Sequence, residues 1–421
     1  MQNNICEVEQ MNIHEGNFLW NMETGIIKKY EYLASNKKCD TLVIGGGITG
    51  ALTAYMQAKS GAHVIIVDKN ILGYGATLKT DGVLLKEMDI TNLKKKSIDN
   101  GKLLKYNKLC SAAMENILNI ISEISEDEDC KKYINLLGLK EMDVMYYSNK
   151  LTNKYYIYKL FERLGETNNK IEYLEQDPLL NLRSAILIPK NGYTINPYVL
   201  TALIYMYLSK KNNVEIYENT YVEKINAKEE GVECTTSNRF KIDSKCVILA
   251  CGINTLKYME NNNIDVYKQF TIVTERIDQK EAKNMDVIAK NISTKNTIVT
   301  FTKDNRIILS GEDIKETERL QDKKYFNYVE KGRYKKLYQT LNKIVPLINP
   351  PKVYKCFYSM YLETKDMLPV IDELENMPNV YVNLSVGKNG IVESMIGANM
   401  LKDVYKKYHI KDMYLFRENR W

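Results

Sequence analysis

The strongest constraint on this chain lies in residues 40–69, where a glycine-rich turn joins two short apolar runs. Thr41–Ile44 is β-branched and apolar and predicts a buried strand, and His63–Val67 predicts a second one. Helix-favouring residues fill the space between them. The turn has the spacing G-x-G-x-x-G, made by Gly45, Gly47 and Gly50. The order strand, turn, helix, strand predicts a βαβ unit with parallel strands.

Each part of this unit has a physical role in holding a dinucleotide. The first glycine permits a tight turn, the second lets the backbone approach a pyrophosphate, and the third lets the helix pack closely on the strand. The helix N-terminus offers free N–H groups and the positive end of the helix dipole. Asp68 ends the second strand, where a carboxylate accepts hydrogen bonds from ribose hydroxyls and disfavours the 2′-phosphate of NADP. This unit alone does not distinguish NAD from FAD as the cofactor.

Composition argues against several other classes of protein. The 59 Lys and Arg are mixed with 53 Asp and Glu along the chain, so the net charge of +6 indicates no nucleic-acid binding. The N-terminus does not resemble a signal peptide, and no apolar run is long enough to span a membrane. The 8 Cys are scattered and the 3 His do not cluster. We therefore expect a reduced, cytoplasmic protein without a metal site.

Four further stretches narrow the choice of cofactor. They are Gly73–Gly82 after the acid-bearing strand, Val247–Gly252 with its Ala-Cys-Gly end, Asp366–Ile371, and Gly387–Ile391. In order and spacing they resemble the D-amino-acid oxidase, glycine oxidase and sarcosine oxidase superfamily of FAD enzymes, over most of residues 38–421. The resemblance implies FAD as the cofactor. It also implies a Rossmann-like domain of the glutathione reductase type and a separate substrate domain.

The resemblance assigns a set of residues to FAD, mostly in turns. Besides the three glycines and Asp68, they are Ile48, Thr49, Lys69, Gly75, Ala76, Thr77, Val222, Ala250, Cys251, Gly252, Gly387, Lys388, Asn389, Gly390 and Ile391. Val222 corresponds to a position whose backbone contacts adenine in the family. Lys388 is a departure, because many relatives have glycine there; its cation either raises the flavin potential or points to solvent. The turn at 387–390 opens a helix whose N-terminus stabilises negative charge on a reduced flavin.

Several positions differ from the pattern of the resembled enzymes. Ser359 stands where sarcosine oxidases carry the cysteine tethered to FAD, and because serine cannot form that thioether we expect FAD to be noncovalent. Val392 and Thr300 stand where relatives keep a lysine or an arginine for a substrate carboxylate. An arginine fork is the usual carboxylate clamp, so an ordinary α-amino acid is disfavoured as substrate. Arg276 and Arg306 are the alternative clamps.

We expect an α/β fold in which an α+β substrate domain, built on an antiparallel sheet, is inserted twice into the FAD-binding domain. An N-terminal extension precedes the βαβ unit, and Trp20 and Leu19 are expected to dock it on the body of the protein. The strand at 353–362 is expected to return the chain to the FAD-binding domain. That domain is assigned residues 1–92, 193–260 and 353–421, and the substrate domain is assigned residues 93–192 and 261–352.

The leading hypothesis is an oxidoreductase that moves a hydride from a small amine or amino-acid-like substrate to noncovalent FAD. One alternative is a dehydrogenase of a hydroxy acid or polyol phosphate, and another is an FAD-binding subunit with little catalysis of its own. Leu309 stands nearest the position where sarcosine oxidases keep a lysine over the flavin. We therefore expect slow reaction with oxygen and a redox partner as acceptor. The catalytic base, the substrate and the oligomeric state stay open.

Overall fold

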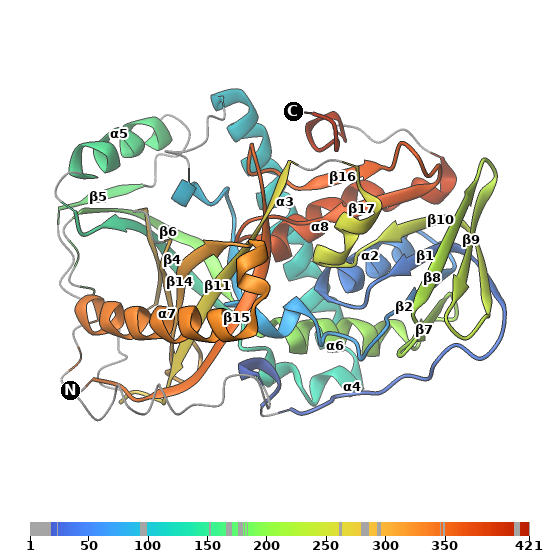
Figure 1. Cartoon of the computed structure of the whole chain (residues 1–421), viewed down its shortest axis with the longest axis horizontal. Helices are drawn as coiled ribbons and strands as arrows, with labels where there is room; N and C mark the ends of the chain where they lie inside the picture. The colour runs from blue at the N-terminus through green and yellow to red at the C-terminus, as the bar shows by residue number, and fades with distance from the viewer. Residues whose placement is uncertain are drawn as a thin grey trace.

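The computed structural model divides into two sheet-based parts that lie side by side (Figure 1). It describes residues 18–22, 24–92, 99–150, 153–165, 171–175, 180, 182, 184–260, 263–278, 286–292, 296–345, 347, 350–407 and 413–420. The glycine-rich turn belongs to the part on the right of Figure 1. The mainly antiparallel sheet forms the part on the left. No helix in these ranges has the length and apolar character needed to cross a lipid bilayer.

The first sheet is built around the predicted βαβ unit. Its strands, in spatial order, are β16 (Val370–Glu373), β17 (Val380–Leu384), β10 (Lys241–Leu249), β1 (Lys37–Ile44), β2 (Val64–Val67) and β7 (Val214–Tyr217). All neighbours except β16 and β17 run parallel. A hairpin of β8 (Val222–Lys228) and β9 (Gly231–Thr236) joins the edge of β10. The buried strands β1 and β2 end at the same edge, which places the glycine turn and Asp68 together.

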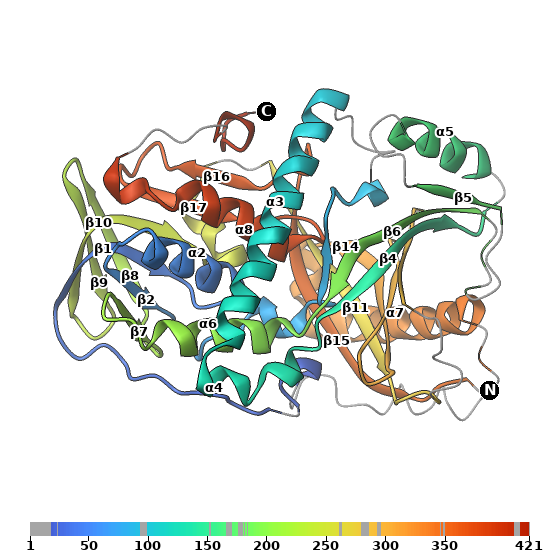
Figure 2. The same cartoon turned by 180° about the vertical axis from the view of Figure 1, so that it is seen from behind.

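Helices cover one face of this sheet. They are α2 (Ile48–Lys59), α3 (Asn100–Ser125), α6 (Pro197–Leu208) and α8 (Gly390–Leu401), with the short α4 (Glu128–Lys131) beside α3 and α6. The helix α2 packs against both α6 and α8, and its small residues Ala51 and Ala54 are fully buried in that contact region. Figure 2 shows α3 crossing the back of the molecule beside α8. The core of the first part lies between these helices and the sheet.

The second sheet places one face against a helix and turns the other toward the first part. Its strands, in spatial order, are β15 (Val353–Thr364), β11 (Ile264–Thr274), β14 (Ile307–Lys315), β13 (Ile298–Phe301), β12 (Val287–Asn291), β4 (Lys140–Ser148), β6 (Ser184–Thr194) and β3 (Val83–Leu85), and β5 (Glu172–Leu174) pairs with β6. The helix α7 (Lys323–Ile344) packs on Phe270 and Ile272, and α5 (Lys154–Gly165) lies by β5. The predicted fold class is confirmed.

Two elements lie elsewhere than the sequence indicated. The strand β15 was expected in the FAD-binding domain, but it pairs with β11 over its whole length and belongs to the second sheet. The helix α3 was assigned to the substrate domain, yet it packs on α8 of the first part. Its predicted first residues, 93–98, lie outside the described ranges. The domain boundaries as such stay a prediction, because a strand that crosses from one part to the other has no local signal for where it belongs.

The N-terminal extension is anchored as predicted. Trp20 is buried and its indole Nε1 donates to the carbonyl of Thr80 at 2.7 Å. Asn196 Nδ2 donates to the carbonyl of Trp20 at 2.8 Å, and Leu19 packs against the same core. The extension therefore holds the loop that follows the short 3₁₀ helix at 76–79. Residues 1–17, which include His14, lie outside the described ranges, as does His409.

Candidate cofactor and substrate site

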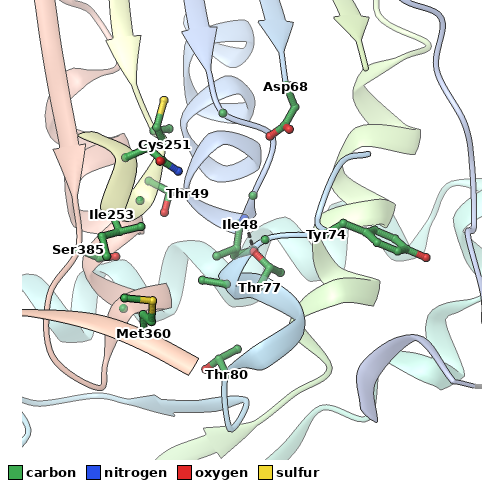
Figure 3. Close-up of a pocket in the computed structure, with 18 of the residues that line it drawn as sticks. Ile48, Thr49, Asp68, Tyr74, Thr77, Thr80, Cys251, Ile253, Met360 and Ser385 are labelled. Atoms are coloured by element: carbon green, nitrogen blue, oxygen red, sulfur yellow. Dashed lines mark hydrogen bonds between the residues drawn. The ribbon is translucent and has the colours of Figure 1, made fainter. Parts of the chain in front are cut away.

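A cavity of about 350 Å³ opens at the carboxyl ends of β1, β2 and β10 and extends to the second sheet. Figure 3 shows Asp68 and Cys251 at one end, and Thr80 and Met360 at the other. Most residues that the sequence assigned to FAD line it: Gly45, Gly47, Ile48, Thr49, Asp68, Lys69, Gly75, Ala76, Thr77, Val222, Ala250, Cys251, Gly252, Gly387, Lys388, Gly390 and Ile391. Gly50 and Asn389 are not among its lining residues. The size is typical of a cofactor or small-molecule site.

The turn at the start of α2 can be built only from glycine. Gly45 has a φ of 113°, and a Cβ there would lie 2.4 Å from the carbonyl oxygen of Ala250. A Cβ on Gly50 would lie 1.8 Å from the carbonyl oxygen of Gly45. Gly50 therefore acts by letting α2 approach β1, while Gly45 and Gly47 face the cavity. The result is a backbone cradle at a helix N-terminus, the arrangement that binds pyrophosphate groups.

Asp68 both faces the cavity and holds the turn. Its Oδ2 accepts a hydrogen bond from the backbone N–H of Gly46 at 2.6 Å, and its Oδ1 accepts from Asn70 N–H at 2.7 Å. Burial raises the pKa of this carboxyl, and the two N–H groups oppose that shift. Each carboxylate oxygen keeps a second lone pair for a ribose hydroxyl. The glycine cradle, the helix N-terminus and this acid together fit the adenosine diphosphate part of FAD.

The other end of the cavity is bounded by the loop between β17 and α8. Lys388 does not point to solvent, so that alternative is wrong: its Nζ lies 2.8 Å from Asp313 Oδ2 and donates to the carbonyl of Asn296 at 2.9 Å. The cation is therefore compensated by a buried carboxylate. Asn389 lies outside the cavity because its side chain bonds both the N–H and the carbonyl of Leu85, at 2.9 and 3.1 Å. It fixes the loop to β3.

The face of the second sheet that is turned toward the cavity follows from its strand register. Gln269 lines the cavity, and Thr271, two residues along β11, shares its face. Thr271 is paired with Ser310 on β14, which continues the row to Ile298 and Lys290. Leu309, expected near the flavin, lies on the opposite face in the core under α7. The expected position is wrong by one residue, and because neighbouring residues of a strand point to opposite faces of the sheet, the side chain lies on the other face.

Two buried charged groups at this end were missed by the sequence reasoning. Lys290 is completely buried, and its Nζ lies 2.7 Å from Asp89 Oδ2. Its strand reads Val287-Ile-Ala-Lys-Asn, and alternation along it could have placed the lysine opposite the apolar face. Asp81 is 5 % exposed and lines the cavity. Burial raises the pKa of its carboxyl, which Lys290 and Lys388 oppose.

A third buried acid supports the loop from behind. Glu393 lies in the first turn of α8, where its Oε2 accepts from the N–H of Val386 at 2.6 Å and its Oε1 accepts from the hydroxyl of Tyr106 at 2.7 Å. Burial raises the pKa of this carboxyl to about 8. Glu393 does not line the cavity, so it is a positioning residue for the loop that does.

The positions at which relatives hold a substrate carboxylate carry no cation here. Val392 is buried in the core, and Thr300 lies on the sheet beside Ile308. Arg276 and Arg306 both bind Asp304, each with Nε to Oδ2 at 3.0 Å, so neither reaches the cavity lining. Ser359 lines the cavity, and noncovalent attachment of FAD stays a prediction.

Comparison with known proteins agrees with the assignment of the glycine cradle to a dinucleotide cofactor. The model of the family described as "FAD dependent oxidoreductase" matches residues 40–404. The chain therefore belongs to this family of FAD-dependent oxidoreductases, which confirms the superfamily indicated by the sequence. FAD is its cofactor, and when bound it supplies the hydride acceptor. Among the described residues, no group of three or more His, Cys, Asp or Glu is arranged to hold a metal ion.

The names of the similar proteins describe different activities. A Bacillus subtilis (strain 168) protein that carries the name of a Rieske 2Fe-2S iron-sulfur protein is 23 % identical, with 92 % of this chain and 72 % of the relative covered. Glycine oxidase from Geobacillus kaustophilus has a TM-score of 0.74 at 17 % identity, covering 92 % of this chain and 100 % of that one. L-amino acid deaminase from Proteus vulgaris has a TM-score of 0.73 at 14 % identity, covering 97 % of this chain and 100 % of that one.

An L-alpha-glycerophosphate oxidase from Mycoplasma pneumoniae, solved with FAD bound, has a TM-score of 0.68 at 16 % identity, covering 89 % of this chain and 96 % of that one. The likeness to these solved structures shows the fold alone. Because the same fold occurs in enzymes named for amino acids and for glycerophosphate, the substrate has to be argued from the side chains of this chain.

Proposed function

We propose that this protein oxidises a small amine, removing a hydride from the carbon that bears the nitrogen. The observation that supports this is the charge at the flavin end of the cavity. The cations among the described lining residues are Lys69, Lys257 and Lys388. Lys69 follows Asp68 at the adenosine end, and Lys257 lies with it near Cys251. Lys388, at the flavin end, already pairs with Asp313.

A hydroxy acid or polyol phosphate would need a cation to hold its anionic group. A paired lysine offers little net attraction, because the carboxylate beside it repels a second anion. The arginines that were the alternative clamps both bind Asp304. An amine needs no such clamp; it needs an acceptor for its N–H. The cavity therefore favours oxidation at CH–NH over CH–OH.

The test is anaerobic reduction of the bound flavin by matched substrates. We expect n-butylamine and N-methylbutylamine to bleach the flavin absorbance, and 2-hydroxybutyrate and glycerol 3-phosphate to leave it unchanged. Alanine should act poorly because its carboxylate finds no free cation. Bleaching by the hydroxy acid or the phosphate, with none by the amines, would establish the alternative function.

A redox partner is proposed as the electron acceptor in place of oxygen. Reaction with oxygen is fast where an uncompensated cation stabilises the superoxide formed first. Here the two buried lysines at this end, Lys290 and Lys388, are each matched by a carboxylate, Asp89 and Asp313. The Bacillus relative named for a Rieske iron-sulfur centre supports a one-electron carrier as partner.

Mixing the reduced protein with oxygenated buffer in a stopped-flow device tests this. We expect slow reoxidation in air and faster reoxidation by ferricyanide. Asp313→Asn leaves Lys388 without its counter-ion and should speed the reaction with oxygen several-fold. Asp265→Asn, which removes the partner of the exposed Lys315 on the same sheet, should not. Equal rates in these two variants would disconnect Lys388 from oxygen reactivity.

A third candidate is an FAD-binding subunit with little catalysis. The anaerobic reduction experiment also tests this candidate, because the flavin of such a subunit would be reduced by a protein partner and by none of the small molecules.

A further inference from the structure

Five charged groups meet where the cavity reaches the second sheet, four with buried side chains and one, Asp89, with a side chain that is 15 % exposed. Two of them are lysines and three are aspartates. Lys290 pairs with Asp89 at 2.7 Å, and Lys388 pairs with Asp313 at 2.8 Å. Asp81 is the odd carboxyl, with no ion pair to any described residue, and it is the only aspartate of the three that lines the cavity. The cluster therefore carries one negative charge more than its cations balance when all five groups are ionised.

The hydrogen bonds of Asp81 are weak for a buried carboxylate. Its Oδ1 accepts from the N–H of Val83 at 3.4 Å and from the hydroxyl of Thr80 at 3.5 Å. Both distances are near the outer limit for a hydrogen bond, whereas a buried carboxylate that serves the fold normally has short bonds. Asp68 shows the contrast, with bonds of 2.6 and 2.7 Å. Asp81 thus retains unused acceptor capacity directed at the space it lines.

The loop that carries Asp81 is held firmly. Trp20 donates to the carbonyl of Thr80, and Ile195 N–H donates to the carbonyl of Gly82 at 2.9 Å. Gly82 has a φ of 71°, and a Cβ there would lie 2.4 Å from the carbonyl of Ile195. A carboxyl on a fixed loop cannot move away to find solvent, so the cost of its desolvation remains, offset in part by Lys290 and Lys388 and further by a cationic ligand.

Resting on the proposed function, we propose that Asp81 binds the ammonium group of the substrate and takes its proton, and that the substrate is an amine with no carboxylate or phosphate beside the reacting carbon. In this step an N–H bond breaks and an O–H bond forms on Asp81. The neutral amine left behind has the lone pair that oxidation requires. Bound FAD, the oxidant of the family, would accept the hydride that the carbon loses, and water would hydrolyse the resulting iminium ion.

A second side chain supports a ligand at this place. Gln269 is 5 % exposed and lines the cavity, and its Nε2 has no hydrogen-bond partner among the described residues. Its amide is thus an unsatisfied buried donor beside the cavity. A buried acceptor and a buried donor that both lack good partners are typical of a site completed by its ligand.

The binding of an amine should depend on pH in a direction that the surroundings of Asp81 determine. The charged groups that face it are Lys290 from β12, Lys388 from the loop before α8, and Asp89 from the loop after β3. Burial, the largest influence, raises the pKa of Asp81 above the usual aspartate value. Above that pKa the carboxylate holds an ammonium ion; below it the neutral acid does not. Affinity should therefore fall as pH falls, at a pH higher than for an exposed aspartate.

The experiment uses two probes of the same shape and opposite charge with the FAD-loaded protein. tert-Butylammonium has no hydrogen on the carbon that bears nitrogen, so it binds without being oxidised, and pivalate is its anionic counterpart. Titration calorimetry should show binding of tert-butylammonium and none of pivalate. Asp81→Asn should weaken the amine at least tenfold and abolish the acid limb of its pH profile.

Asp372→Asn is the matched control. Asp372 is also buried with a raised pKa, but it accepts from the N–H of Glu418 at 3.0 Å and does not line the cavity. Its variant should bind the amine like the unaltered protein.

Equal amine affinity in the unaltered protein and in Asp81→Asn overturns the inference, as does a preference for pivalate. If Asp81→Asn loses FAD, the pH profile of the unaltered holoprotein decides, because an affinity that stays level through the acid range refutes a role for any carboxylate. The proposed function is tested separately. If amines bleach the flavin to the same extent without Asp81, the function stands and the role of Asp81 fails. If no amine bleaches the flavin, the proposed function fails, whatever the probes bind.

Discussion

Gly50→Ala should cost the protein most of its affinity for FAD. The added Cβ would lie 1.8 Å from the carbonyl oxygen of Gly45 and 3.1 Å from the hydroxyl of Tyr205. The first of these is a backbone atom that cannot rotate away, so α2 has to move from β1 and the pyrophosphate cradle distorts. Overpacking of this kind typically costs about 1–3 kcal/mol, and we expect at least a tenfold loss of FAD affinity.

Gly332→Ala is the control for this change. Gly332 lies within α7, and a Cβ there meets no atom within 4 Å. Replacing a helical glycine at an open position should stabilise the protein by roughly 0.5–1 kcal/mol. Fluorescence titration of the apoprotein with FAD, together with urea unfolding, measures both quantities. Unchanged FAD affinity in Gly50→Ala would mean that the contact of α2 with β1 does not shape the cradle.

Glu393→Gln should make the protein more stable than the unaltered chain at neutral and alkaline pH. Burial raises the pKa of Glu393 from 4.5 to about 8, so the folded state holds a proton that the unfolded state has released. The unfolded state binds fewer protons between these two values, and the free energy of unfolding therefore falls as pH rises from about 4.5 to about 8 and is level above. A shift of this size corresponds to about 3–5 kcal/mol.

Glutamine keeps an acceptor for the N–H of Val386 and has no proton to lose. The difference in unfolding free energy between the variant and the unaltered protein should therefore grow with pH and then level off, in urea titrations at pH 5, 7 and 9. Tyr106→Phe removes the bond to Oε1, which lowers the pKa of Glu393, but it leaves the acid. This variant should therefore still lose stability as pH rises, and the loss should extend to higher pH than in the unaltered protein. A Glu393→Gln difference that is the same at all three pH values would place the pKa of this acid in its normal range.

Local pattern was enough to find the cofactor cradle. Gly45 needs a positive φ, and the backbone at Gly50 needs to come close to a strand; both requirements act on single residues and leave a spacing in the sequence. The period of two in β1 and β2 and the acid that ends β2 are local as well. For this reason most of the residues predicted for FAD lie together around one cavity.

The local sequence pattern was not enough where the answer depended on which distant segment packs beside a strand or side chain. The strand β15 alternates in the same way whichever sheet it joins, so its place beside β11 could not be derived from its own residues. On β14, Leu309 was set one position out of register, which turned it to the wrong side of the sheet. Lys388 was expected in solvent or acting on the flavin, because the carboxylate that compensates it is far away in sequence, on β14.

By itself, therefore, the sequence determined the βαβ unit, the FAD cradle and the family, since these depend on the conformation and spacing of neighbouring residues. Tertiary structure alone decided which charges are matched and which is left over. Asp81, Asp89, Lys290, Asp313 and Lys388 come from five separate segments, and the energy of a buried charge depends on what is folded against it. Only after folding does Asp81 become the acid without a counter-ion, and Glu393 the acid that keeps its proton.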